Sequence, residues 1–196
     1  AQSYEGTIKD AKDEYIAKNI DSDPFRFMDD IGAGKYNAVF RTEAERRDAT
    51  EMVKDRALKV QQLTSEKQIL GVLRDENSLL AKSMESPLPY DALQKEMART
   101  NMSLASRAYF LKANGYTKTD GIVKLDPGEQ LSYKSSIYDE IINVTSQEEI
   151  SANSISALQD KIYKGMVNGS LTEKEGVDFL NQVLAPIAAK KEESLD

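Results

Sequence analysis

The residues with the clearest potential for chemistry are Gly34 and Lys35, because a Gly-Lys pair ends the phosphate-binding loop of many nucleotide-binding proteins. That loop also needs an earlier glycine, a Ser or Thr after the lysine, and a preceding strand. Here Asp29 holds the place of the earlier glycine, Tyr36 follows the lysine, and the residues before the loop read as helix. We therefore interpret this segment as the end of a helix rather than as a nucleotide site.

Acidic residues cluster at four places, but none has the spacing of a metal or catalytic site. With Gly121 at the sixth place of a calcium loop, positions one, three and twelve would be Tyr116, Lys118 and Pro127, which are not the carboxylates that the ion needs. The adjacent acids Asp29-Asp30 and Glu148-Glu149 point about 100° apart on a helix. We interpret these acids as turn residues and solvated helix surface.

Histidine and cysteine are both absent from the 196 residues. A Ser-His-Asp or Cys-His mechanism is therefore impossible within the chain, and so is a thiolate metal site. An enzyme built on this sequence would need carboxylates, lysine, tyrosine or a carboxylate-bound metal. Whether the chain is an enzyme stays open, with a non-enzymatic role favoured, and we assign no catalytic residue, no cofactor and no metal.

Net charge and composition narrow the class of partner. The formal charge of −7 argues against a dedicated nucleic-acid binder, whose affinity comes mainly from cations on phosphate. No apolar run approaches 18 residues, so no transmembrane segment is predicted. An apolar content of 40% is normal for a folded protein and allows a sizeable core. We expect partners to be proteins, either a second copy or other components of an assembly.

One stretch, Thr42 to Glu85, dominates the predicted fold, because its 44 residues contain no proline and one glycine. As a single helix it would span roughly 66 Å, longer than a compact domain of this size requires. Ser65 offers a break, since it can cap a second helix with Gln68 reaching back from three residues on. We favour a break or kink near 64–65, and a continuous protruding helix stays the alternative.

The remaining pattern predicts an all-α protein, an irregular bundle of about seven to nine helices around segment 42–85. A discontinuity is expected near Thr100-Asn101, and a bend at Pro186. Helix starts are predicted from Asp23-Pro24, from Asp126-Pro127, and from two capping boxes, Ser146–Glu149 and Thr172–Glu175. The pattern also predicts helices over 4–20 and 91–113, and the last helix, after Thr172, is expected to fray into the acidic tail beyond Pro186. Helix stops are predicted at Gly32-Ala33-Gly34, Asn114-Gly115 and Asn168-Gly169.

Glycine and proline cluster at 115–128, which predicts a small non-helical island with a loop or one short strand at Gly121–Leu125. We place a soft boundary there. The predicted organisation is a helical domain over 1–114, this island, and C-terminal helices over 129–196 that pack on the first part.

No catalytic or metal-binding motif is recognised in the sequence. The leading functional hypothesis is therefore a non-enzymatic structural or interaction module that acts through association of helix faces. The apolar side of the long stretch, together with two aromatics of the preceding connector, is the candidate interaction surface. Those aromatics have a second interpretation, pinning the short helix 24–31 onto the long one. The alternative function is a secreted or periplasmic binding protein with a ligand pocket between the helices flanking 114–128. The candidate surface residues are Tyr36, Phe40, Met52, Val60, Leu63, Leu70, Leu73, Leu80 and Met84.

Two segments resemble the internal, ejected virion proteins of tailed phages and prophages. The first is Asp23-Pro-Phe-Arg-Phe-Met-Asp-Asp-Ile-Gly-Ala-Gly-Lys-Tyr36 with the charged helix after it, and the second is Ile162–Pro186 with its Gly-Ser-Leu-Thr-Glu-Lys-Glu run. The resemblance implies a helical module of a larger virion protein. Some members carry a transglycosylase domain, but Glu85-Ser86 lacks the downstream Gly-Leu-Met-Gln, so no catalytic residue is implied. The implied location is the virion or bacterial cytoplasm, or the periplasm if a signal peptide preceded Ala1.

Overall fold

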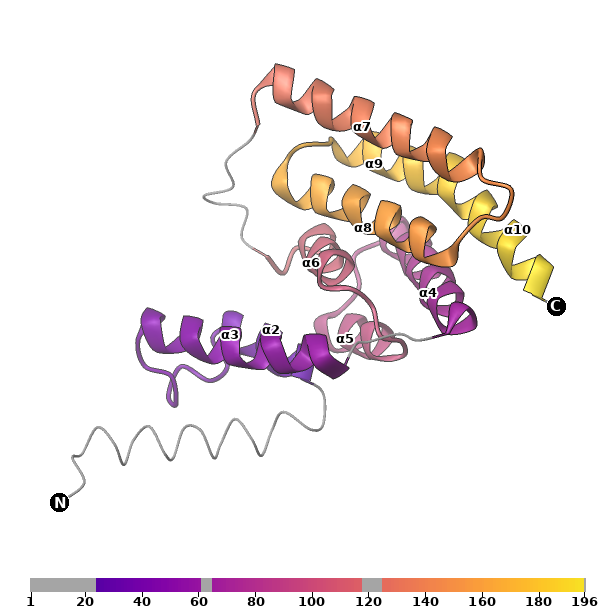
Figure 1. The fold of residues 1–196 in the computed structure, drawn as a ribbon. Coiled ribbons are helices and arrows are strands. Elements are labelled where there is room, and N and C mark those ends of the chain that lie inside the picture. Colours follow the sequence, from indigo (N-terminus) through magenta and orange to yellow (C-terminus); the bar gives the residue numbers. More distant parts are fainter. Residues whose placement is uncertain (1–23, 61–64, 118–124, 196) are drawn as a thin grey trace. The chain divides into compact units, whose positions relative to one another are not determined.

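A computed structural model describes residues 24–60, 65–117 and 125–195, with the side chains of 56–60 left out. These residues form helices joined by turns, and no strand occurs among them, which confirms the predicted all-α class (Figure 1). The helices are α2 (Pro24–Gly32), α3 (Glu43–Val60), α4 (Glu66–Glu85), α5 (Tyr90–Ala98), α6 (Leu104–Ala113), α7 (Pro127–Thr145), α8 (Ala152–Asn168), α9 (Glu173–Phe179), the π-helical turn η1 (Leu180–Leu184) and α10 (Ala185–Leu195).

The chain divides into two compact units, 1–62 and 63–196. In the first unit, α2 packs against α3. Gly34 has a φ of +91°, a conformation that glycine adopts at low cost, so it turns the chain after α2 as the sequence predicted. The core of this unit consists of Phe27, Ile31, Phe40, Ala49 and Val53.

The long stretch is two helices, which confirms the break that we favoured near residue 65. Ser65 has extended backbone, and its side chain accepts a hydrogen bond from the Gln68 amide at 3.2 Å. The Gln68 side chain accepts in return from the Ser65 amide at 3.4 Å. This capping box satisfies amide groups that a continuing helix would have bonded, so α4 begins independently of α3.

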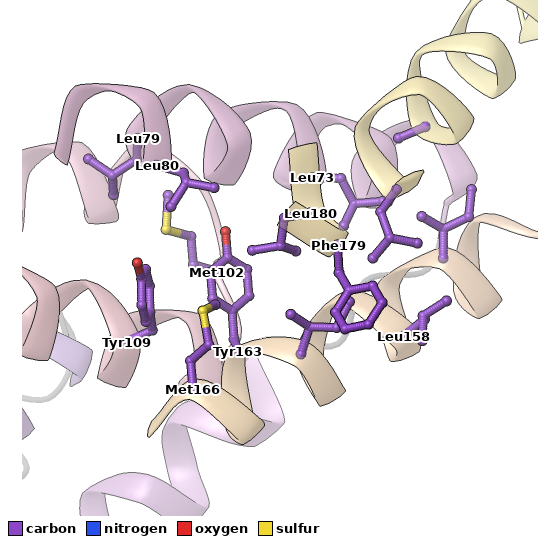
Figure 2. Close-up of a cluster of buried hydrophobic side chains, with 14 of the residues drawn as sticks. Leu73, Leu79, Leu80, Met102, Tyr109, Leu158, Tyr163, Met166, Phe179 and Leu180 are labelled. Carbon is purple, nitrogen blue, oxygen red and sulfur yellow. The ribbon is translucent and has the colours of Figure 1, made fainter. Parts of the chain in front are cut away.

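The second unit has one core, to which every one of its helices contributes. Its helices are joined by packing of α8 against α4, α6, α7 and α9, and of α10 against α4. Side chains of α4, among them Leu73 and Leu80, meet Tyr163 of α8 and Leu180 of η1 in this cluster (Figure 2). Helix α8 is therefore the central element around which the others are arranged.

Most helix ends lie where local residues predicted them. Asp126 accepts a hydrogen bond from the Glu129 amide at 2.9 Å, with Pro127 in the first turn of α7. Thr172 and Glu175 form the predicted capping box of α9. Helix α5 ends at Ala98 and α6 starts at Leu104, as the weak helix formers between them suggested.

The predicted capping box at Ser146 is wrong. Helix α7 continues to Thr145, and the Ser146 amide donates to the Ile142 carbonyl at 3.0 Å as the last bond of that helix. Its backbone is helical, so it cannot adopt the extended geometry of an N-cap. Helix α8 therefore starts only at Ala152, after Ser151.

Near the C-terminus the chain continues from α9 through η1 into α10. The Ala185 amide donates to the Leu180 carbonyl, five residues back, which defines the π-helical turn. Pro186 follows directly and has no amide hydrogen to donate to residue 182. The sequence predicted a bend at Pro186, and the structure has a π-helical turn, which is wider than an α-helical one, just before the proline.

The predicted boundary at 114–128 does not coincide with the division between the compact units, which lies between Gln62 and Leu63. Helices on either side of that loop, α6 and α8, pack together within one unit. The predicted helix over 4–20, the Asp23 cap and the short strand at 121–125 lie wholly or mainly outside the described residues.

Candidate interaction surface

Among the described residues, the surface candidates that precede α4 do not form one patch. Phe40 is buried in the core, and Tyr36 is half-buried with its ring edge-on to Phe27 at 5.0 Å between centroids. Both aromatics belong to the cluster formed by α2 and α3, which agrees with the second interpretation, that they pin the short helix onto the long one. Met52 is 48% exposed. The side chain of Val60 and the whole of Leu63 lie outside the described residues.

On α4 the candidate residues belong to the core rather than to an exposed surface. Leu70, Leu73 and Leu80 are buried, because the face that carries them packs against α8 and α10. Met84, near the C-terminal end of α4, is 55% exposed. The break before α4 explains this outcome, since a separate helix of 20 residues can bury its apolar side within a compact unit.

An exposed apolar surface is found instead on α7. Leu131, Tyr138 and Ile142 are 66%, 52% and 62% exposed, although side chains of this kind are usually buried. Spacings of seven and four residues place them within about 40° of one another around the helix. Ser135, also exposed, lies between them on the same side. These four residues are called the α7 stripe.

The opposite side of α7 is firmly attached to the bundle. Ile137 and Val144 are buried in the core. The Tyr133 hydroxyl donates to the Lys161 carbonyl of α8 at 2.6 Å, and the Lys161 ammonium bonds Glu140 at 2.5 Å. Because these contacts fix the rotation of α7 about its axis, the stripe lies on the side of the helix away from α8. The ring of Tyr138, at the edge of the stripe nearest α9, also packs edge-on against Phe179 at 5.0 Å between centroids.

Charges on the two sides of the stripe are few. Lys134 forms a 2.6 Å ion pair with Glu175 of α9. Its hydrogen bond holds the pKa of the Glu175 carboxyl below its ordinary value. On the other side lies the exposed Asp139. The residues that flank the stripe therefore include one cation, Lys134, which is neutralised by Glu175, and one carboxylate, Asp139. The stripe itself carries no charged side chain and is mainly apolar.

Sequence reasoning missed the stripe, although a signal for it existed. The apolar residues of α7 spread too widely around the helix to be buried on one side. Ile137 and Val144 point in one direction, whereas Leu131, Tyr138 and Ile142 lie about 100° or more away. A helix at the edge of a bundle can bury only one of these sets. That excess of apolar positions indicates a second contact surface.

A cavity of about 370 Å³ lies between α6, α7, α8 and α9, where the helices flanking 114–128 meet the rest of the unit. Its polar walls are already bonded within the protein. The Tyr109 hydroxyl donates to Glu173 at 3.1 Å, and Lys112 donates to the Met166 carbonyl at 2.9 Å. Burial first, and then the Glu173 carboxylate, raise the pKa of Tyr109. The cavity can take a small molecule, but its polar side chains mainly hydrogen-bond groups at the C-terminal end of α8 and the N-terminal end of α9.

The segments first considered for chemistry have structural roles. Lys35 forms a 3.5 Å ion pair with the buried Asp30, which also pairs with Arg26 at 3.8 Å. Across the described ranges, no three acidic side chains lie close enough to hold a metal ion. None of the helices in these ranges combines the length and the hydropathy of a membrane-spanning segment.

Comparisons with protein-family models, with curated proteins and with solved structures find no match to this chain.

Proposed function

We propose that this protein is a non-enzymatic helical interaction module that binds another protein helix through the α7 stripe. The observation that supports this is the exposure of three large apolar side chains on one face of a helix whose other face is fixed. An apolar helix face of this kind can be covered by a second helix, whose side chains fit between its own. Our proposal that the module belongs to a larger phage or prophage virion protein rests on the two motif resemblances alone.

The test is a photo-crosslinking residue placed on the stripe. Tyr138 is replaced by p-benzoylphenylalanine, a similar aromatic, and the protein is irradiated both purified and in an extract of its source cells. We expect a discrete crosslinked protein product. The matched control carries the same residue at Asn143, which is exposed on the same helix but about 120° from the centre of the stripe. Equal labelling from both positions, or none from Tyr138, would contradict the proposal.

A second candidate function is ligand binding in the cavity lined by Tyr109, Lys112 and Gln130. It is favoured by the position of the cavity, between the helices that flank 114–128. A thermal-shift screen of small metabolites tests it, since a ligand that binds only the folded state raises the melting temperature. A hit should lose its shift when Ala113, on the cavity wall, is replaced by Leu, and a shift that survives this change argues for binding elsewhere.

A further inference from the structure

We propose that a second copy of this chain covers the α7 stripe, with the two α7 helices antiparallel about a two-fold axis. This inference rests on the proposed function and names its partner. A two-fold interface must be self-complementary, because the same surface is present on both sides. The α7 stripe has this property in one register of its residues.

The order of side chains along the stripe is self-complementary in one antiparallel register. When the axis passes between positions 136 and 137, Leu131 meets the partner's Ile142, and Ser135 meets the partner's Tyr138. Each apolar residue at an end of the stripe faces another apolar residue. At the centre the large Tyr138 faces the small Ser135, so neither copy leaves a gap or a clash. The pairing occurs twice by symmetry and covers the whole stripe.

The charges at the rim also fit this arrangement. In an antiparallel pair each side of α7 meets the same side of its partner. Lys134 and its symmetry mate are then five positions apart along the axis, about 7.5 Å, and each retains its own Glu175. The two Asp139 carboxylates are separated in the same way, and each lies near the partner's Ser132, whose hydroxyl can donate to it. A parallel pair would instead place the two bulky Tyr138 side chains against each other at the same level.

The net charge of the chain favours the uncharged α7 stripe as the surface through which two copies meet. Two chains with a net charge of −7 repel each other, and they approach most easily through a surface without net charge. Antiparallel helices also align the positive end of one helix dipole with the negative end of the other. The stripe extends over 11 residue steps from Leu131 to Ile142, about 16 Å, which is small for an interface. We therefore expect a reversible dimer, weaker than about micromolar.

Sedimentation equilibrium over a concentration series tests the association. We expect a monomer–dimer equilibrium for the natural chain, and a dissociation constant at least about tenfold higher for the double variant Leu131→Lys, Ile142→Lys. The matched control is Met84→Lys, an exposed apolar residue of the same unit on a different helix, which should leave the constant unchanged. Circular dichroism on each variant shows whether its helices are intact.

Cysteine crosslinking tests the orientation, because the natural chain contains no cysteine. A size-tagged Leu131→Cys chain is mixed with an untagged Ile142→Cys chain and treated with a short bismaleimide. The antiparallel register predicts a crosslink between the two different chains. It predicts none between two Leu131→Cys chains, whose residues lie about 16 Å apart along the axis. Crosslinking of Leu131→Cys with itself would overturn the register and indicate a parallel pair.

The outcomes separate this inference from the proposed function. A chain that stays monomeric at every concentration, but crosslinks from Tyr138 to another protein in the extract, overturns the dimer and leaves the interaction module standing. A monomer that crosslinks to nothing overturns both. An equilibrium that Met84→Lys weakens as much as Leu131→Lys, Ile142→Lys would place the dimer interface elsewhere and would also overturn the inference.

Discussion

Glu76 of α4 is a buried carboxylate whose hydrogen bonds come from uncharged side chains. Ser106 of α6 donates to one oxygen at 2.9 Å, and Gln159 of α8 donates to the other at 2.8 Å. Burial raises the pKa of Glu76 to about 7, a shift that these two bonds reduce and that nearby Asp160 increases. Because the folded-state pKa lies above the ordinary 4.5, the folded protein binds this proton more tightly than the unfolded chain.

Stability should therefore fall as the pH rises from about 4.5 to about 7. Above about pH 7 the ionised Glu76 should lower the free energy of unfolding by an amount on the order of 3 kcal/mol. The substitution Glu76→Gln keeps the shape without the charge: its amide oxygen can accept from Gln159, and its NH2 can donate to the Ser106 hydroxyl oxygen. We expect it to raise the melting temperature by several degrees at pH 8 and to change it little at pH 4.5. Thermal melts followed by circular dichroism at both pH values measure this.

Glu96 serves as the matched control for Glu76. Although burial opposes the shift, Lys82 and Arg99 hold the pKa of Glu96 below its ordinary value. Its contribution to stability is therefore present at neutral pH and lost on acidification, the opposite sign. Glu96→Gln should not stabilise the protein at pH 8. A stabilisation as large as that from Glu76→Gln would refute the explanation by burial.

The sequence contained little warning of this buried cluster. Glu76, Ser106 and Gln159 are separated by 30 and 53 positions, and each looks like an ordinary polar residue of an amphipathic helix. Their meeting depends on how α4, α6 and α8 pack. The α7 stripe, by contrast, involves residues of one helix, and for that reason its signal was present in the local pattern.

Two helical glycines with different surroundings allow a matched prediction about helix packing. A Cβ atom on Gly176 of α9 would overlap with the Sδ and Cγ atoms of Met166 in α8. A Cβ on Gly71 of α4 would come no nearer than 3.9 Å to a neighbouring side chain. Gly176 therefore permits the close approach of α9 to α8, whereas Gly71 has no such role.

We expect Gly176→Ala to destabilise the protein by about 1–3 kcal/mol through overpacking, after any gain in helix propensity. Gly71→Ala should stabilise it by up to about 1 kcal/mol, because alanine is the better helix former. Urea unfolding of both variants measures the difference. If the two alanines have equal effects, the close contact at Gly176 does not limit packing.

Helix ends were the part of the fold that sequence predicted best, since a cap needs only a few neighbouring residues. Ser65, Asp126 and Thr172 each had the right partner three positions on, and each caps a helix in the structure. Ser146 had the same local pattern but lies at the end of α7. There the continuing apolar contacts of α7, with Val144 in the core, prevail over the local capping signal.

The division of the chain into units could not be predicted from composition. Gly and Pro cluster at 115–128, but the core of the second unit is formed by residues from both sides of that loop, from Ile69 to Ala188. The described residues of the first unit have a core of their own. Which distant helices share a core depends on packing, and a single sequence does not reveal that.

We therefore predict that residues 63–196 fold alone, since they contain the whole of this core and the capping box that starts α4. The fragment should unfold cooperatively in urea, with a midpoint close to that of the second unit in the full chain. It should also retain the association through α7. A fragment that lacks cooperative unfolding would show that the second unit depends on residues 1–62.

The aromatic rings at the centre of that unit also make it an optical reporter. Tyr109, Phe110 and Tyr163 lie with ring centroids 5.2 to 5.5 Å apart, Tyr163 is buried, and the chain has no tryptophan. Near-ultraviolet circular dichroism should therefore include a contribution from these fixed rings, whereas the far-ultraviolet signal follows all helices together. A state that retains its helices but loses the packing of α6 on α8 would lose the first signal and retain the second.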